Sequence, residues 1–278
     1  QVVNQNAIKV DKAVELNEEL RSIKSPWDII KLNDWAIRQD IDFLKDQRRY
    51  QRISSTNKTI AEKEIYIEKG ALVEHCFLNA TDGPIYIAKN ATVMEGTMLR
   101  GPIAIGEGAT VKMGTKIYGA SSIGPNCSVG GEIKNSILFA NSNKAHDGYL
   151  GDSAIGEWCN LGAGTSNSNV KNNASSIMVY TPSGLINAGI KSGVIMGDYS
   201  RTAINTSINT GTVIGVCCNV FGSGLTPKYI PSFSWGSEGV QRYHFEKALA
   251  HIENWKALKN QKITDNEASI LNHIFDHY

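Results

Sequence analysis

One histidine stands alone in the long glycine-rich part of this 278-residue chain. It is His146, within the segment NKAHDGYLGDSAIG at residues 143–156, and the nearest histidines along the chain are His75 and His244. A neutral imidazole, whose reference pKa is roughly 6.5, can accept a proton from an amine nucleophile at neutral pH. His146 is therefore a candidate general base. The alternative is that it is an incidental polar residue of a loop.

Other groups suited to acyl transfer lie close to His146 in the sequence. A Gly-Ala-Gly turn would leave the backbone N–H of Ala163 open to an oxyanion, and one such donor typically lowers a barrier by ~3 kcal/mol. Asn169 can orient an amine or a carbonyl, and Lys134 offers a point charge to a phosphate. The plain alternatives are that Lys134 is a solvated side chain and that Tyr149 is an inward-facing residue of a repeat.

A six-residue repeat must position these groups. Every sixth residue over one long stretch is aliphatic: Ile87, Val93, Leu99, Ile105, Val111, Ile117, Ile123 and Val129. The position four residues later is mostly small: Ala91, Thr97, Ile103, Ala109, Thr115, Ser121, Cys127 and Ile133. This is the hexapeptide pattern of a parallel β-helix, in which each short strand points an aliphatic side chain inward.

Bends between the strands need residues that tolerate positive φ, which Gly and Asn do. We assign Asn167, Asn172 and Asn173 to such bends. The repeat loses its phase between residues 134 and 155 and again between 166 and 196, which predicts loops or irregular coils there.

The five cysteines show no pattern that indicates chemistry. No pair has CxxC spacing, so neither a disulfide framework nor a zinc site is indicated, and no metal site is predicted. Cys127, Cys159 and Cys218 fall on the small inward position, which favours core packing over reactivity.

The composition changes on both sides of the repeat. Of the 26 glycines, 21 lie between residues 101 and 225, whereas residues 1–60 are rich in charged side chains. Such a shift is typical of a domain boundary. We therefore place a helical segment at 1–60, the β-helix at 61–236 and a C-terminal helical arm at 237–278.

The arm and the segment before it carry their own signals. Residues 238–258 place apolar side chains, Val240 among them, at near-helical spacing, and TDNE at 264–267 predicts a capping box. The segment at 226–236 is expected to cover the last coil, and its Lys228 is a candidate contact for a coenzyme A phosphate.

Charge and hydropathy limit the classes of partner. The net charge is +1 at pH 7 and no run of five basic residues occurs, so neither nucleic acid nor an anionic membrane is predicted as a partner. No apolar run approaches the roughly 18 residues of a membrane span, and QVVNQNAIKV at the start lacks the features of a signal peptide. We expect a cytoplasmic protein. Because the chain begins with Gln rather than Met, we also expect it to be part of a longer polypeptide.

The segment KAHDGYLGDSAIGEWCNLGAGTSNSN, residues 144–169, resembles a known family. It is similar to the acetyltransferase half of the bifunctional N-acetylglucosamine-1-phosphate uridyltransferase/glucosamine-1-phosphate acetyltransferases. Their run reads Lys-Ala-Gly-His, two residues, Tyr-Leu-Gly-Asp, then Ile-Gly, Asn, Gly-Ala-Gly-Thr and a further Asn. Residues 25–42, SPWDIIKLNDWAIRQDID, also look like the end of a sugar nucleotidyltransferase domain. The resemblance implies that residues 1–60 are such an end with a linker helix, and that a mainly β, left-handed parallel β-helix of hexapeptide repeats follows.

The resemblance also implies roles for individual residues. His146 matches the catalytic base, Ala163 the residue whose backbone N–H faces the thioester oxygen, and Asn169 an Asn near the thioester. The positions that match contacts to the acceptor sugar or its phosphate are Lys134, Tyr149 and Asn160. The chain departs from the family after Asn169, where it reads NVKNNASS and Lys171 is the candidate replacement for a family Lys. A family Arg has Lys116 as its candidate replacement.

The implied function is acetyl-CoA-dependent N-acetylation of an amino-sugar phosphate, with glucosamine 1-phosphate as the first candidate, in UDP-N-acetylglucosamine synthesis. Acetyl-CoA would be a co-substrate, with Lys171 and Lys228 as candidate contacts, and a homotrimer is expected because the family binds coenzyme A between neighbouring β-helices. Mg²⁺ would serve only the nucleotidyltransferase part, whose Gly-rich loop ending Gly-Thr-Arg-Met is absent here.

Two alternatives belong to other classes of protein. The first is a structural or regulatory trimerising β-helix attached to a sugar nucleotidyltransferase domain, without acyl transfer of its own. The second is a carbonic anhydrase on the same fold, which would need three His ligands on adjacent coils. We set the second aside because the β-helix holds only His75 and His146.

Overall fold

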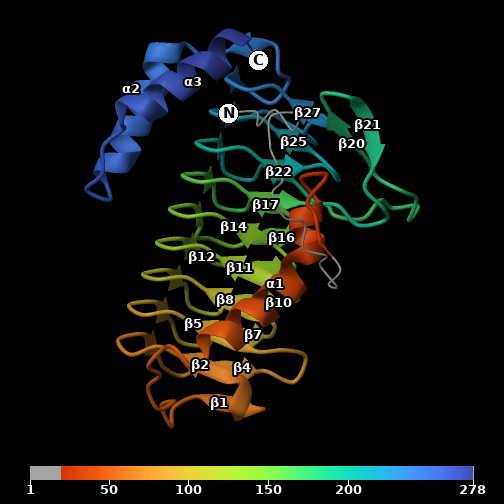
Figure 1. The fold of residues 1–278 in the computed structure, drawn as a ribbon. Coiled ribbons are helices and arrows are strands. Elements are labelled where there is room, and N and C mark those ends of the chain that lie inside the picture. The colour runs from red at the N-terminus through yellow and green to blue at the C-terminus, as the bar shows by residue number, and fades with distance from the viewer. Residues whose placement is uncertain (1–19, 278) are drawn as a thin grey trace, which may run out of the picture.

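The computed structural model describes residues 20–277. Figure 1 shows them as a tall stack of short strands, with one helix along its side and two helices at its end. Residues 1–19, part of the expected nucleotidyltransferase end, lie outside the described residues. Of the helices described, none is long and apolar enough to cross a membrane.

Three parallel sheets form the walls of the stack, so the predicted parallel β-helix is confirmed. The first sheet contains β1 (Lys58–Ile60), β4 (Phe77–Asn79), β7 (Met98–Arg100), β10 (Lys116–Tyr118), β13 (Glu132–Lys134) and β16 (Tyr149–Gly151). The pair β19 (Ser166–Asn167) and β24 (Ser207–Ile208) lies next to β16 and extends this wall.

The other two walls run the full height of the stack. The second sheet contains β2 (Ile65–Ile67), β5 (Ile85–Ile87), β8 (Ile103–Ile105), β11 (Ser121–Ile123), β14 (Ile137–Leu138), β17 (Ala154–Ile155), β22 (Ile195–Met196), β25 (Val213–Ile214) and β27 (Tyr229–Ile230). The third contains β3 (Leu72–Val73), β6 (Thr92–Val93), β9 (Thr110–Val111), β12 (Ser128–Val129), β15 (Asn143–Lys144), β18 (Asn160–Leu161), β23 (Arg201–Thr202), β26 (Asn219–Val220), β28 (Ser234–Trp235) and an antiparallel β29 (Gln241–Arg242). A short 3-10 helix, η2 (Glu62–Glu64), precedes β2.

The predicted inward rows are confirmed. Ile87, Ile105 and Ile123 pair in register on neighbouring strands of the second sheet, so each of these coils holds three of the six-residue repeats. All eight aliphatic residues and all eight residues of the small row are buried. Full burial of one such aliphatic side chain stabilises the fold by about 1.5–3 kcal/mol before entropy is considered, so this interior column is the main core.

The cysteines assigned to the core are buried there, as predicted. Cys127, Cys159 and Cys218 are free thiols inside the solenoid. Burial raises the pKa of Cys127 and of Cys218 to about 11, which keeps these thiols protonated and unreactive at neutral pH.

The two breaks in the repeat have different causes. Between residues 134 and 155 the break is an irregular coil and not a loop, because β14, β15 and β16 continue the three walls. Ile123 pairs with Leu138, which comes earlier in the chain than a full coil would place it, so this coil is shortened in its turns. Between 166 and 196 a true insertion occurs, since Ile155 pairs with Met196, far more than one coil later in the chain. It carries the hairpin of β20 (Met178–Thr181) and β21 (Gly184–Asn187), at the upper right of Figure 1.

The bend assignment of three asparagines is also wrong. Asn90, Asn126 and other residues at bends do have positive φ, but Asn167, Asn172 and Asn173 do not. Asn167 is buried, and its side chain bonds both the N–H and the carbonyl of Gly151 on the coil below.

A helix runs along the second sheet. This is α1 (Asp28–Leu44), and its Ile37 and Ile41 pack against Ala120 of the solenoid. Asn33 donates to the Ala120 carbonyl at 2.7 Å and accepts from the Ser122 hydroxyl at 2.8 Å. The first strand begins at Lys58, slightly before the expected β-helix boundary at 61.

The C-terminal arm packs on turns beside the third sheet. Its helices are α2 (Phe245–Ala257) and α3 (Asp265–His277), at the top left of Figure 1. The capping box is present, because the Glu267 N–H donates to the Thr264 hydroxyl at 3.2 Å and the Thr264 N–H donates to the Glu267 carboxylate at 2.7 Å. Two expectations change. The helix begins at Phe245 and not at 238, so Val240 lies outside it and is exposed. Residues 226–236 form the last coil and do not cover it, because β27 and β28 lie in the walls.

Candidate active site

His146 lies in a tight turn between the third and first sheets. The turn joins β15 to β16, and the His146 side chain is exposed. Gly148 has φ +126°, and a Cβ there would lie 2.2 Å from the carbonyl oxygen of Thr165 on the coil above. The turn therefore packs directly under the next coil while its imidazole stays open to a substrate.

The Gly-Ala-Gly turn lies immediately above. The Gly164 N–H donates to the Asp147 carbonyl at 2.9 Å, and the Ala163 carbonyl accepts from the Asn205 N–H at 2.7 Å. Among the described residues, no acceptor takes the N–H of Ala163. The predicted base and the predicted oxyanion donor thus lie on stacked turns of adjacent coils.

A polar cluster lies on the outer face of the first sheet. Asn169 donates its side-chain amide to the Tyr149 hydroxyl at 3.2 Å and to the Asp152 carboxylate. Asp152, buried, also accepts from Asn135 at 2.7 Å. The Tyr149 ring lies against Gly151, where a Cβ would come 2.3 Å from the hydroxyl oxygen. Tyr149 therefore faces outward, its neighbour Leu150 fills the interior, and the inward alternative for Tyr149 is wrong.

Lys134 lies one strand below this cluster. It pairs in register with Gly151, and its ammonium is 5.7 Å from the centre of the Tyr118 ring. The Tyr118 hydroxyl donates to Glu132 at 2.6 Å, which raises the pKa of Tyr118 to about 12. Burial, followed by the charge of Asp152, raises the pKa of Tyr149. Both phenols thus stay neutral at physiological pH and can serve as hydrogen-bond donors.

Two of the proposed substrate contacts lie away from this cluster. Lys116 is in the same outward row as Glu132 and Tyr149, two strands below Tyr149, or about 10 Å at ordinary strand spacing. Asn160 faces outward on the third sheet, between Asn143 on the coil below and Arg201 on the coil above. A single chain therefore places Asn160 on a different wall from Lys134, Tyr149 and Asn169.

The two lysines suggested for coenzyme A lie near each other, at the inserted segment. Lys228 donates to the Thr210 hydroxyl at 2.7 Å, and Lys171 donates to the Ser176 carbonyl at 2.6 Å. Burial lowers the pKa of Lys228, and the positive charge of Lys171 lowers it further. Like charges placed together favour an anionic ligand.

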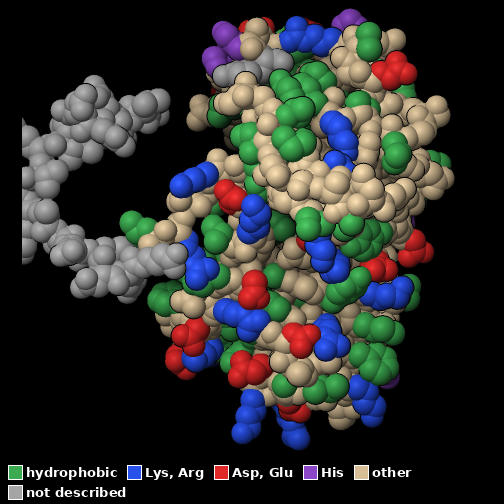
Figure 2. All heavy atoms as spheres, turned by 90° about the vertical axis from the view of Figure 1, so that its right-hand side faces the viewer, with side chains coloured by type: hydrophobic (Ala, Val, Ile, Leu, Met, Phe, Trp, Pro, Cys, Tyr) green, Lys and Arg blue, Asp and Glu red, His purple; other side chains and the backbone are tan. Residues whose placement is uncertain are grey.

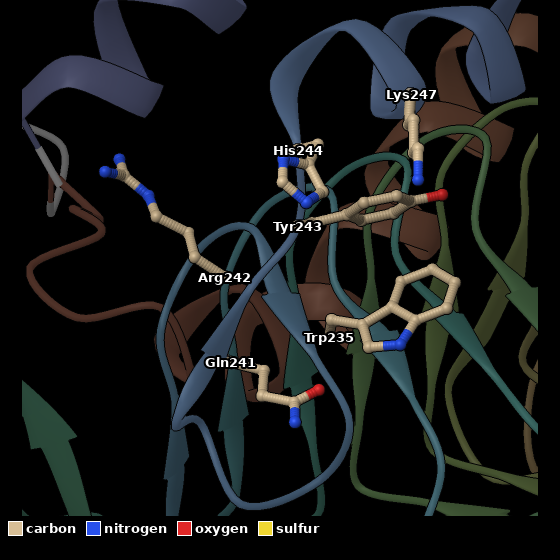
Figure 3. Close-up of a pocket in the computed structure, with 6 residues that line it drawn as sticks. All are labelled: Trp235, Gln241, Arg242, Tyr243, His244 and Lys247. Atoms are coloured by element: carbon tan, nitrogen blue, oxygen red, sulfur yellow. The ribbon is translucent and has the colours of Figure 1, made fainter.

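A separate pocket of about 480 Å³ lies where β29 meets the arm. Figure 3 shows Trp235 and Tyr243 with their rings side by side, while Arg242 points away from the other labelled side chains. The two ring centres are 4.8 Å apart. None of the site residues predicted from the sequence lines this pocket.

Figure 2, looking onto the right-hand side of Figure 1, shows acidic and basic side chains interspersed over the lower coils.

Two residues of the site were missed by sequence reasoning. Asp152 was read only as the end of the Tyr-Leu-Gly-Asp run, although it joins Asn135 to Asn169. Lys144 was read as part of the family motif, yet it is buried beside His146. The repeat gave no signal for it, because residue 144 is out of phase with the inward aliphatic row in the sequence. Within the described residues, no group of three His, Cys, Asp or Glu side chains could hold a metal ion.

Comparison with known proteins identifies relatives over most of the chain. A "Bifunctional protein GlmU" from Methanocaldococcus jannaschii is 30% identical over 231 residues, which are 80% of this chain and 48% of that protein. A "Bifunctional sugar-1-phosphate nucleotidylyltransferase/acetyltransferase" from Sulfurisphaera tokodaii is 30% identical over 213 residues, 76% of this chain and 47% of that protein. No family model matches the chain.

Solved structures give weaker matches. A hexapeptide transferase family protein from Anaplasma phagocytophilum is 14% identical, with a TM-score of 0.30 over 78% of this chain and 92% of that one. The polysialic acid O-acetyltransferase OatWY is 15% identical, with a TM-score of 0.31 over 64% and 81%. At such scores the description of the fold rests on the sheet topology itself.

The similarity to known proteins therefore rests on the sequence relatives and not on the solved structures. The name of the Sulfurisphaera tokodaii relative describes a transferase, and the chain spans about half the length of the curated relatives it matches. Over 76–80% of its length the chain is thus similar to part of bifunctional GlmU-type proteins and of a sugar-1-phosphate nucleotidylyltransferase/acetyltransferase.

Proposed function

We propose that this chain is an acetyl-CoA-dependent N-acetyltransferase that acts on an amino-sugar phosphate, with glucosamine 1-phosphate as the first acceptor to test. It would serve UDP-N-acetylglucosamine synthesis within a longer sugar nucleotidyltransferase. The observation that carries the proposal is the stacking of the His146 turn under the Ala163 turn. A base and an oxyanion donor are the two groups that acyl transfer to an amine requires.

The roles follow from the chemistry of each group. His146 takes a proton from the acceptor amine as its nitrogen attacks the thioester carbonyl carbon. The oxyanion that forms accepts a hydrogen bond from the Ala163 N–H, the C–S bond then breaks, and the proton passes from the imidazolium to the departing thiolate. This sequence balances without a metal or another co-reactant.

The polar cluster on the first sheet supports the orientation of the acceptor. Tyr149 and Asn169 already hydrogen bond to each other, with Asp152 fixing the amide, so a sugar would meet a prearranged set of donors and acceptors. Lys134 has no ion-pair partner among the described residues and would place its charge near a phosphate. Lys171 and Lys228 would meet phosphates of coenzyme A.

A homotrimer would unite the separated groups. Asn160 lies on the third wall and Lys134 on the first, so one chain does not close a pocket around both. In the proposed three-fold assembly the third wall of one subunit would lie near the first wall of another, and each prism-like solenoid offers flat sides for such packing. Sites shared between subunits are the expected consequence.

The decisive experiment is a thiol-release assay with acetyl-CoA and a panel of amino-sugar phosphates. Saturable release that depends on glucosamine 1-phosphate supports the proposal, and glucose 1-phosphate is the control that lacks the amine. Absence of release with every amine, from a folded trimeric protein, would favour the structural or regulatory β-helix instead.

A further inference from the structure

A lysine occupies the interior wall of the solenoid just before the His146 turn. Lys144 pairs in register with Val129, on a row that is otherwise aliphatic except at Thr202, and only 2% of it is exposed. Leu161 fills the same row one coil above. Because an ammonium inside an apolar column loses its hydration, such a position is unfavourable unless the charge is well bonded.

The Lys144 ammonium reaches two backbone carbonyls at the corner of the coil. It donates to the carbonyl of Gly130 at 3.1 Å and to the carbonyl of His146. Gly130 belongs to the turn below and His146 to the turn with the candidate base. One side chain therefore ties two stacked turns together from inside the solenoid. Burial lowers the pKa of Lys144 to about 8, while the charge of Asp147 acts to raise it.

We propose that Lys144 is a positioning residue that holds the His146 turn from the interior and so fixes the direction of the imidazole. This inference rests on the function proposed above, in which His146 is the base. The two side chains lie on opposite sides of the solenoid wall. The His146 side chain is exposed, whereas the Lys144 ammonium donates to the His146 carbonyl from the interior. The backbone that carries the imidazole is then fixed. A general base needs this because it must lie within hydrogen-bond reach of the proton that it accepts.

A role in folding alone would predict a different response to substitution. A methionine is apolar, unbranched and close to lysine in length, so Lys144→Met should pack in the wall with little loss of stability. Replacing a buried charge by a hydrophobic side chain is often neutral or stabilising. The carbonyls of Gly130 and His146 would, however, lose their donor. Stability and catalysis should therefore change independently.

The test compares three variants. Lys144→Met removes the donor, Lys144→Gln keeps amide donors without the charge, and Leu161→Met is the matched control on the same row one coil above. Each would be assayed for kcat and KM, for Tm, and for hydrogen exchange. Three amides report opening of the turn because the structure bonds them across it: Glu132 to the Gly148 carbonyl, Tyr149 to the Ser166 hydroxyl, and Gly164 to the Asp147 carbonyl.

We expect Lys144→Met to lower kcat by about ten- to a hundredfold, the scale of a small misplacement of a reacting group. KM should change little, Tm should stay or rise, and the three amides should exchange faster. Lys144→Gln should fall between Lys144→Met and the unsubstituted chain, whereas Leu161→Met should leave all four measurements near their starting values. In a His146→Ala background, Lys144→Met should cause no further loss of kcat.

Other outcomes overturn the inference. If Lys144→Met folds and keeps its kcat and its exchange rates, Lys144 holds nothing that catalysis needs. If it lowers Tm and kcat together, as a packing defect would, the residue is only part of the core. Should Lys144→Met fail to fold, Lys144→Gln decides by the same criteria. If the unsubstituted chain acetylates no amine, the proposed function fails, and the exchange rates still decide whether Lys144 holds the turn.

Discussion

The N–H of Gly164 donates to the carbonyl oxygen of Asp147 at 2.9 Å, so the turn that carries Ala163 rests on the turn that carries His146. Neither residue of this pair takes part in the proposed chemistry. The backbone contact instead sets the separation between the proposed base and the proposed oxyanion donor. In a solenoid that separation is fixed by the spacing of adjacent coils, close to the roughly 4.7–4.9 Å between neighbouring strands.

The first prediction concerns the base. His146→Ala should lower kcat by about two to four orders of magnitude, the usual contribution of a positioned proton acceptor. The KM for acetyl-CoA should change little, because the imidazole is assigned proton transfers during the reaction and no part in holding the bound acetyl-CoA. Steady-state kinetics on the best acceptor would measure both parameters. A variant that folds normally and turns over like the unsubstituted chain would make His146 a loop residue.

The solenoid itself could be predicted because its inward rows are strictly periodic. From Ile87 to Ile133 a buried aliphatic or small residue recurs at every expected place. The shortened coil from Ile123 to Leu138 could not be predicted. Removing residues from turns shifts the phase of the pattern but leaves the strand pairing intact. Periodicity records a constant coil length, and it fails where that length changes.

The site was predictable only where it is contiguous in sequence. The resemblance over residues 144–169 placed His146, Tyr149 and Asn169 together. The bond from Asn135 to Asp152 joins neighbouring coils in the region where the repeat changes phase, so the repeat did not reveal it. The inward position of Lys144 was hidden for this reason as well, since its pairing with Val129 crosses the shortened coil.

A second prediction separates orientation from proton transfer. Asn169→Ala should slow acetyl transfer by less than His146→Ala does, because it removes bonds to Tyr149 and Asp152 and leaves the base in place. Its pH–rate profile should keep the shape of the parent profile. Kinetics between pH 5 and 9 would check this, with exposed Asn173→Ala as the control. A loss equal to that of His146→Ala would give Asn169 a direct part in the chemistry.

The third prediction tests the packing of the His146 turn. Gly148→Ala should destabilise the chain by about 1–3 kcal/mol, because φ is +126° and the added Cβ meets the Thr165 carbonyl at 2.2 Å. Gly184→Ala is the matched control, since its φ is +108° but nothing lies within 4 Å of the added atom. Urea unfolding measures the difference, and equal effects of the two substitutions would contradict the close packing of the His146 turn under Thr165.

The fourth prediction concerns assembly. Phe77 and Met98 pair in register on the outer face of the first sheet and are 52% and 50% exposed, an apolar spot suited to a subunit contact. Sedimentation should give a trimer, and Phe77→Asp should weaken it. Leu185→Asp, on the exposed hairpin, should not. A stable, fully active monomer at micromolar concentration would refute the trimer.

A carboxylate links the helical arm to the solenoid. Glu267 of α3 accepts from the Tyr199 hydroxyl at 2.9 Å, from the buried ammonium of Lys256, and from the N–H of Thr264. Burial alone would raise the pKa of Glu267, but these hydrogen bonds outweigh it and lower the pKa to about 2. Lys256 also lies over the Trp158 ring of the solenoid, 5.3 Å from its centre.

The last prediction is the pH dependence that this carboxylate imposes on the arm. A carboxyl whose pKa falls from its ordinary 4.5 to about 2 on folding stabilises the folded arm fully above pH 4.5. That contribution is lost as the pH falls from 4.5 towards 2, where the carboxyl takes up a proton. Glu267→Gln should loosen the arm at pH 7 and remove this acid-dependent step, whereas Glu246→Gln, at an exposed position of α2, should keep it. Hydrogen exchange of α3 as a function of pH would measure the step, and parallel profiles for Glu267→Gln and the unsubstituted chain would show that the arm is held by its apolar contacts alone.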